Sequence, residues 1–207
     1  MASEESNLIE EMNDIIEEAL RKESPPPQAD SKAITFHILN LAIRIEKLSG
    51  EHYSGMAKKV KDPRGKDMFK YLAKEESKHA KALKTEYEAI KQDNNWLMKE
   101  KVLPQERVCA VVDPKKKAVK ASRDIMPEES HVTKSTTDLE ALKLAMEVKK
   151  RAIKFYCAAG AKIQDPQGRK MFSRLVSIEN RHLNELEVQY AWLDEAGFWY
   201  DHTMMTD

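Results

Sequence analysis

The sequence predicts an all-α protein: a four-helix bundle made from a duplicated helical hairpin, with a long central crossover and a short N-terminal helix. Three observations support this prediction. Glycine and proline occur only 6 and 8 times in 207 residues, which is typical of a mostly helical chain. Two similar segments begin with Asp-Pro, DPRGKDMFKYLAKEESKH at 62–79 and DPQGRKMFSRLVSIENRH at 165–182. Apolar residues around them recur at spacings of three and four, as on one face of a helix.

The first expected element is a short amphipathic helix at about residues 7–23. Its apolar residues recur at helical spacing, and the prolines at 25–27 end it. A helix this short gains most of its stability from packing, so we expect it to dock on this bundle or on a symmetry mate; recognition of another protein is the alternative. The predicted organisation is an N-terminal helix with a Pro-rich linker, a bundle, and a C-terminal tail, at residues 1–29, 30–200 and 201–207.

The first predicted hairpin follows this linker. A helical pattern continues from Asp30 to about Lys61. Asp62 is expected to cap a second helix that carries Pro63 in its first turn and continues to about residue 92. Residues 93–136 are too numerous for a tight turn between antiparallel helices, so we interpret them as a crossover.

The second predicted hairpin repeats the first. A Thr-x-x-Glu capping box at 137–140 begins a third helix that extends to about residue 164, and Asp-Pro at 165–166 begins a fourth that extends to about residue 195. Residues 39–90 align with 142–193 at a constant shift of 103, without a gap. Two hairpins with one apolar face each bury those faces against one another as a four-helix bundle.

Charge and cysteine content exclude several classes of function. The 35 basic and 35 acidic residues cancel, so no overall field favours nucleic acid or an acidic membrane surface. No stretch approaches the roughly 20 apolar residues of a membrane span, and the N-terminus is acidic where a secretory signal would be basic. Cys109 and Cys157 form no CxxC pair, which argues against a zinc knuckle or a rubredoxin-type iron site. We therefore expect a cytoplasmic protein that binds neither nucleic acid nor membrane.

Each repeated segment places a glutamate and a histidine on its apolar stripe. These residues are Glu76 and His79 in the second predicted helix, and Glu179 and His182 in the fourth. A buried carboxylate is costly unless it is paired or bound to a cation. Because the pair recurs on both core faces, a metal ion at the bundle centre is favoured. The alternative is that protonated histidines simply pair with the glutamates.

These motifs resemble the rubrerythrin branch of the ferritin-like di-iron carboxylate proteins. The resemblance also includes the spacing of seven between Glu46 and Tyr53, the FY of the third helix and the terminal GFWYD, and it covers about residues 31–201. It implies a ferritin-like bundle with metal ligands from all the inward acids and both histidines. The implied ligands are Glu46, Glu76, His79, Glu179 and His182. Such ligands suit iron, manganese or zinc, and the resemblance favours one or two iron ions.

The third predicted helix departs from this pattern. The position equivalent to Glu46 is Lys149, and the nearest acid, Glu147, lies about 200° around the helix. An ammonium has no lone pair for a metal. Three outcomes follow: two metals with water or another residue filling the gap, one metal, or a degenerate centre in which Lys149 pairs with Glu179 or Glu46.

Two tyrosines are candidate catalytic residues. Tyr53 and Tyr156 lie on the inward stripes, seven residues after Glu46 and Lys149 respectively. There they are expected to hydrogen-bond a ligand carboxylate or a bound oxygen species. Ordinary core packing with a satisfied hydroxyl is the alternative.

The resemblance implies an iron-dependent oxidoreductase that reduces peroxide or dioxygen. Rubrerythrins proper draw electrons from a rubredoxin module; this chain carries none, so we expect an external electron-donor protein. The alternative is a non-catalytic bundle silenced by Lys149, in which the N-terminal helix and the aromatic tail AGFWY mediate assembly or partner binding. We also expect a homodimer, and the sequence leaves open whether the hairpins pack within one chain or are exchanged between two.

Overall fold

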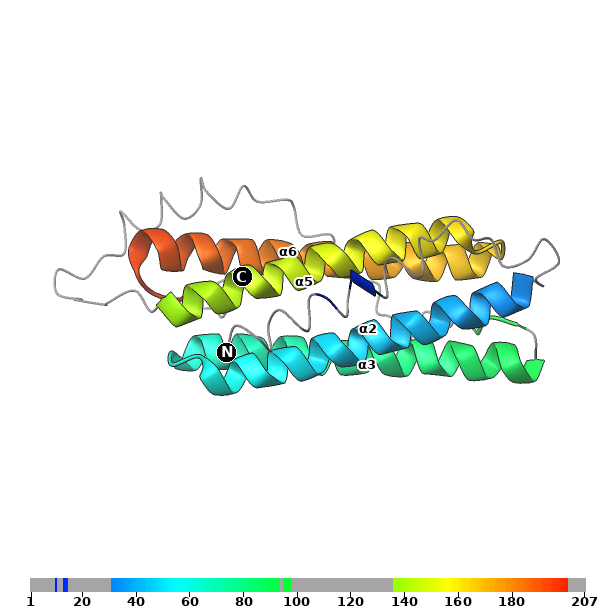
Figure 1. The fold of residues 1–207 in the computed structure, drawn as a ribbon, viewed down its shortest axis with the longest axis horizontal. Coiled ribbons are helices and arrows are strands. Elements are labelled where there is room, and N and C mark those ends of the chain that lie inside the picture. The colour runs from blue at the N-terminus through cyan, green and yellow to red at the C-terminus, as the bar shows by residue number, and fades with distance from the viewer. Residues whose placement is uncertain (1–9, 11–12, 15–30, 94, 98–135, 201–207) are drawn as a thin grey trace.

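A computed structural model describes residues 10, 13–14, 31–93, 95–97 and 136–200. From residue 31 onward, the described chain forms helices and no strand. The helices are α2 (Ser31–Lys59), α3 (Pro63–Asp93), α5 (Thr136–Lys162) and α6 (Pro166–Ala196). Figure 1 shows the α2–α3 hairpin and the α5–α6 hairpin as two layers lying side by side. The predicted all-α bundle of two helical hairpins is confirmed. Most of the predicted N-terminal helix, most of the crossover and the tail at 201–207 lie outside the described residues; residues 10 and 13–14 are helical.

The two Asp-Pro turns begin their helices as the sequence predicts. The Asp62 carboxylate accepts the backbone N–H of Arg64 at 2.8 Å, which satisfies one of the free donors at the start of α3. Asp165 does the same for α6, accepting the N–H of Gln167 at 2.7 Å. The α6 helix ends at Gly197, whose φ of 80° lies in the left-handed region that favours glycine. The helix bounds therefore follow from local residue chemistry.

One tryptophan from each hairpin packs on the turn between the two helices of the other hairpin. Trp199, which follows α6, lies on Gly65 at the start of α3, where a Cβ atom would sit 2.5 Å from the indole ring. Trp96, which follows α3, lies in the same way on Gly168 at the start of α6, again at 2.5 Å. Only glycine leaves room for these rings. Trp199 also donates from Nε1 to Asp138 of α5 at 3.0 Å. The two hairpins thus hold each other reciprocally.

One hydrophobic core continues across both hairpins. Large side chains without solvent exposure lie on every helix, such as Leu39, Phe69, Phe155 and Phe172. Burying each such side chain contributes roughly 1.5 to 3 kcal/mol, which can offset the cost of enclosing polar groups. The core does enclose polar groups, near the middle of the bundle. No helix within the described ranges is both long and apolar enough to span a bilayer.

Candidate metal centre

Six polar side chains meet in the middle of the bundle, and we call them the buried cluster. The helix α2 contributes one, α3 two, α5 one and α6 two, and each is 3% exposed or less. In α3 and α6 the glutamate and the histidine are three residues apart, so both point from one face of the helix. The members are Glu46, Glu76, His79, Lys149, Glu179 and His182. The predicted inward orientation of these residues is confirmed.

Lys149 bridges two carboxylates of the buried cluster. Its Nζ donates to Glu76 Oε1 at 2.6 Å and to Glu179 Oε2 at 2.5 Å. The sequence suggested Glu179 or Glu46 as the partner of Lys149. The structure shows the pair with Glu179, and the second partner is Glu76 instead of Glu46. Glu147 points away from the bundle, as predicted, with a 45% exposed side chain that pairs with Arg151. Lys149 is consequently the residue of α5 that enters the cluster.

On the other side of the cluster, three ligand-type atoms have no hydrogen-bond partner. They are Glu46 Oε2, His79 Nδ1 and Glu179 Oε1. His79 Nδ1 lies 3.4 Å from each of the two carboxylate oxygens. These residues and Glu76 can each offer one ligand atom within 4.8 Å of all the others. Buried carboxylates are costly unless a positive charge lies beside them. A proton on His79 supplies that charge at 3.4 Å, and with that proton removed the four residues fit a single cation among them.

His182 lies beside these four residues but not among them. Its ring stacks on that of His79 with 5.9 Å between centroids. The Nε2 atom contacts Arg181 at 3.3 Å, and Nδ1 has no partner. Burial, reinforced by the Lys149 charge, lowers the pKa of His182 well below its usual value. The ring is therefore neutral and keeps a lone pair, as a metal ligand requires, but its role as a ligand stays a prediction.

The two candidate tyrosines occupy equivalent places with different partners. The Tyr156 hydroxyl donates to Glu46 Oε1 inside the core. The Tyr53 hydroxyl reaches only the Ala145 carbonyl, at 3.5 Å. Burial raises the pKa of both phenols well above the usual value, so both stay protonated donors. The structure thus places Tyr156 on a candidate ligand, while Tyr53 is a packed core side chain.

The charges in the cluster are strongly interdependent. Burial opposes the charge of Lys149 and His79, but the surrounding carboxylates outweigh it and raise the pKa of both groups well above their usual values. Burial also favours neutral Glu179, yet Lys149 and His79 hold its pKa well below the usual range. For Glu76, burial dominates, and with the nearby acids it raises the pKa against the effect of Lys149. Metal-free, the cluster therefore combines two cations with a carboxyl group that tends to stay protonated.

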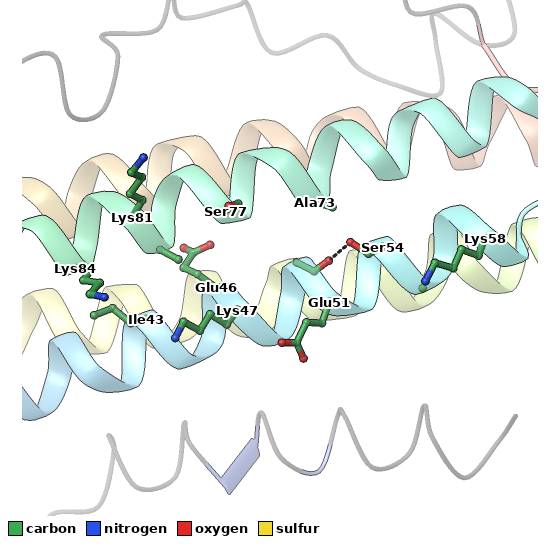
Figure 2. A pocket seen from close by; sticks show the side chains of 13 residues that line it. Ile43, Glu46, Lys47, Glu51, Ser54, Lys58, Ala73, Ser77, Lys81 and Lys84 are labelled. Atoms are coloured by element: carbon green, nitrogen blue, oxygen red, sulfur yellow. Dashed lines mark hydrogen bonds between the residues drawn. The ribbon is translucent and has the colours of Figure 1, made fainter.

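A cleft leads from the surface to the buried cluster. It has a volume of about 750 Å³, lies between α2 and α3, and is lined by Glu46 at its inner end (Figure 2). Sequence reasoning missed this feature. The available signal was a set of small residues in the first repeat, Gly50, Ala73 and Ala80, where the second repeat carries Ile153, Val176 and Leu183.

Comparison with known proteins identifies a family. A family model described as Rubrerythrin matches residues 37–190, which include the whole buried cluster. A search of curated proteins and a search of solved structures each returned no match. The family match agrees with the four-helix arrangement and with the position of the Glu/His cluster.

Proposed function

The chain belongs to the rubrerythrin family, and on that premise we propose that its buried cluster holds one metal ion, iron, for the reduction of peroxide or dioxygen. The observation that carries the proposal is the convergence of three buried ligand-type atoms that make no hydrogen bond, Glu46 Oε2, His79 Nδ1 and Glu179 Oε1. A bound ion would take the place of the proton through which His79 pairs with the two carboxylates at 3.4 Å. Imidazole and carboxylate ligands suit iron, manganese or zinc, and the family favours iron. When bound, iron would supply electron transfer and Lewis acidity.

The residues around this position support one ion rather than two. Lys149 already satisfies Glu76 Oε1 and Glu179 Oε2. Its ammonium has no lone pair for a metal and repels a second cation. Glu46, His79 and Glu179 would hold the ion, with Glu76 as a further ligand after a change in its pairing. The ammonium thus takes the charge role that a second metal ion would have.

Protons for the reaction are held next to the ligands. Reduction of hydrogen peroxide to two waters consumes two protons and two electrons. Tyr156 holds a proton at its hydroxyl, on Glu46, and Lys149 holds protons at Nζ, on Glu76 and Glu179. Lys149 has a third N–H that it would donate to a small oxygen species at the centre, whereas Tyr156 has a single O–H and would have to release Glu46 to do so. In this proposal an external donor protein supplies the electrons, and the protein is a homodimer.

A second candidate function is a non-catalytic assembly or interaction protein. The two ion pairs of Lys149, with Glu76 and Glu179, favour this function, because the ammonium stabilises both carboxyl groups without a metal ion. The aromatic tail is a poor partner site in this reading. Trp199 is 1% exposed inside its own bundle, and the backbone of Tyr200 is tied to Gln189 of α6 by two hydrogen bonds. The interaction role would then fall on the predicted N-terminal helix, most of which lies outside the described residues.

Metal content separates the two candidates. After anaerobic loading with iron(II) and removal of excess, the proposal expects about one iron per chain by elemental analysis, because binding requires only the preformed ligand atoms. The same protein should reduce hydrogen peroxide when a chemical electron donor is supplied. A content below about a tenth of an ion per chain, with iron, manganese and zinc alike, contradicts the proposal and leaves the non-catalytic candidate.

Lys149→Glu tests the ligand arrangement more sharply. The substitution restores the carboxylate that the repeat lacks in α5, so we expect metal content to rise towards about two ions per chain. Lys150→Glu is the matched control, because it makes the same change of charge at an exposed neighbouring position. Its metal content should equal that of the parent. If Lys149→Glu also stays at the parental value, the second metal position does not exist where the repeat places it.

A further inference from the structure

The cleft between α2 and α3 is lined by residues that differ from their equivalents in the second hairpin. Its walls include the small residues Gly50 and Ala73. A Cβ atom on Gly50 would lie 3.4 Å from Cβ of Glu76, so the wall of the cleft reaches the buried cluster. The equivalent positions of the second hairpin carry the larger Ile153 and Val176. The small residues of the cleft are therefore not a feature that the repeat imposes on both hairpins.

The rim of the cleft is basic. Four exposed lysines line it, together with the exposed Glu51, as Figure 2 shows. These lysines are Lys47, Lys58, Lys81 and Lys84. The equivalent positions in the second hairpin carry only two lysines and one acid, in the set Lys150, Ala161, Asn184, Glu187 and Lys154. The positive charge therefore belongs to the hairpin that carries this cleft and not to the shared helical frame.

The inner end of the cleft is a candidate ligand. Glu46 lines the cleft, and its Oε2 is one of the three ligand-type atoms that make no hydrogen bond. Tyr156 donates to its other oxygen, and His79 lies 3.4 Å from Oε2. The negative charge of Glu46 is thus compensated from inside, so that the lysines dominate the field at the mouth.

We propose that this cleft is the entrance by which small anions reach the buried cluster. The inference rests on the proposed function, because a bound metal ion is what would bind the anion at the inner end. A cleft lined by one sign of charge with low-dielectric walls concentrates ions of the opposite sign. The lysine rim therefore accelerates small anionic ligands, is indifferent to neutral ones and repels free metal cations.

Azide binding to the iron-loaded protein tests the charge of the entrance. Stopped-flow absorbance gives the association rate for the parent and for the double variant Lys81→Glu/Lys84→Glu. We expect the variant to bind azide about tenfold more slowly at low salt, with the difference shrinking as salt screens the rim. Nitric oxide, a neutral ligand, should bind both proteins at the same rate.

The matched control changes the same charge on the other hairpin. Lys150→Glu/Lys154→Glu reverses two exposed lysines of α5 and should alter azide association less than about twofold. Equal slowing by both double variants would show a general effect of net charge and overturn the proposal. An unchanged rate in Lys81→Glu/Lys84→Glu would overturn it as well.

Filling the cleft tests the route itself. Ala73→Val/Ala80→Leu introduces the residues that the second hairpin carries at the equivalent positions, and it should slow azide and nitric oxide alike. Ser77→Asn, also a residue of the second hairpin and exposed here, is the variant to use if the double variant does not fold. Unchanged entry of both ligands in a folded, filled variant would overturn the route.

A metal-free measurement separates failure of this inference from failure of the proposed function. Ser54 lines the cleft, and Cys157 is its equivalent in the second hairpin. Two proteins with a single cysteine each are compared. One carries Ser54→Cys together with Cys109→Ser and Cys157→Ser, and the other carries Cys109→Ser and keeps the native Cys157. For each thiol we take the ratio of its reaction rate with an anionic disulfide reagent to its rate with a neutral one. This ratio should be about threefold higher for the thiol in the cleft than for Cys157. Equal ratios would overturn the basic entrance even if iron binds; a higher ratio without iron binding would leave the entrance standing and reject the metal.

Discussion

The two hairpins share one frame and differ in its centre. Both have an Asp-Pro cap, a glycine under a tryptophan from the other hairpin, and an inward Glu-x-x-His. At one equivalent position, however, α2 carries Glu46 and α5 carries Lys149, and both are buried. A buried carboxylate in one half thus corresponds to a buried cation in the other, within the same frame. The difference is tolerated because Lys149 neutralises carboxylates that would otherwise need a metal ion.

The tyrosines show the same difference in a second pair of residues. Tyr156 donates to Glu46, and at the equivalent place Lys149 lies over the ring of Tyr53, 5.4 Å from its centroid. One geometry therefore supports a hydrogen bond in one half and a cation–π contact in the other. The comparison indicates that the duplicated frame sets positions, while the residue at each position sets the chemistry.

The largest expected effect comes from breaking the shared frame. Trp199→Ala should lower the free energy of unfolding by about 3 to 5 kcal/mol, because a large cavity opens over Gly65. Trp96→Ala should also be costly, but less so, since Trp96 is 7% exposed and Trp199 also donates to Asp138. Urea unfolding of the metal-free variants measures both. A loss below about 1 kcal/mol for Trp199→Ala would show that the tryptophan does not hold the hairpins together.

A smaller effect should distinguish the two tyrosines. Tyr156→Phe removes the donor to Glu46 and leaves a buried carboxylate oxygen unpaired, at a cost of about 1 to 3 kcal/mol. Tyr53→Phe loses only a 3.5 Å contact to a carbonyl, and should cost less than about 1 kcal/mol. The two variants serve as controls for each other in urea unfolding without metal. Equal losses would contradict the asymmetry of the hydrogen bonds.

The smallest expected effect concerns pH and compares His52 with its equivalent, Phe155. Burial, with the Lys59 charge, lowers the pKa of His52 from 6.5 to about 4. His52 therefore binds a proton more readily in the unfolded chain than in the folded protein. Its contribution to the free energy of unfolding is fully present at neutral pH and is lost as the pH falls from 6.5 towards 4. His52→Phe should remove that loss, a relative gain on the order of 1 to 2 kcal/mol at pH 4 after allowance for solvent contact.

Urea unfolding of parent and His52→Phe at several pH values isolates this contribution, because the other titrating groups are common to both proteins. The difference in unfolding free energy between the two should stay constant above pH 6.5 and grow below it. A difference that is independent of pH would show that His52 does not titrate in this range.

Several features were predictable because their causes are local. The Asp62 and Asp165 caps, the helix bounds and the inward stripe follow from residue types and spacing of three and four. Glu147 could be excluded by its angle on the helix, and its side chain is indeed exposed. The equivalence of Trp96 and Trp199 also follows from the repeat shift of 103, although both residues lie beyond the matched segments 39–90 and 142–193.

The sequence by itself determined the helices, their duplication and which polar residues turn inward, because periodicity and capping act within a few residues. Only the tertiary structure decided that Lys149 bridges Glu76 and Glu179 rather than Glu46, that His182 stands outside the four converging residues, and that a cleft reaches Glu46. These features depend on the distances between helices, the rotation of each helix and the side-chain conformations. Such quantities are set by the packing of the whole core, and no local pattern encodes them.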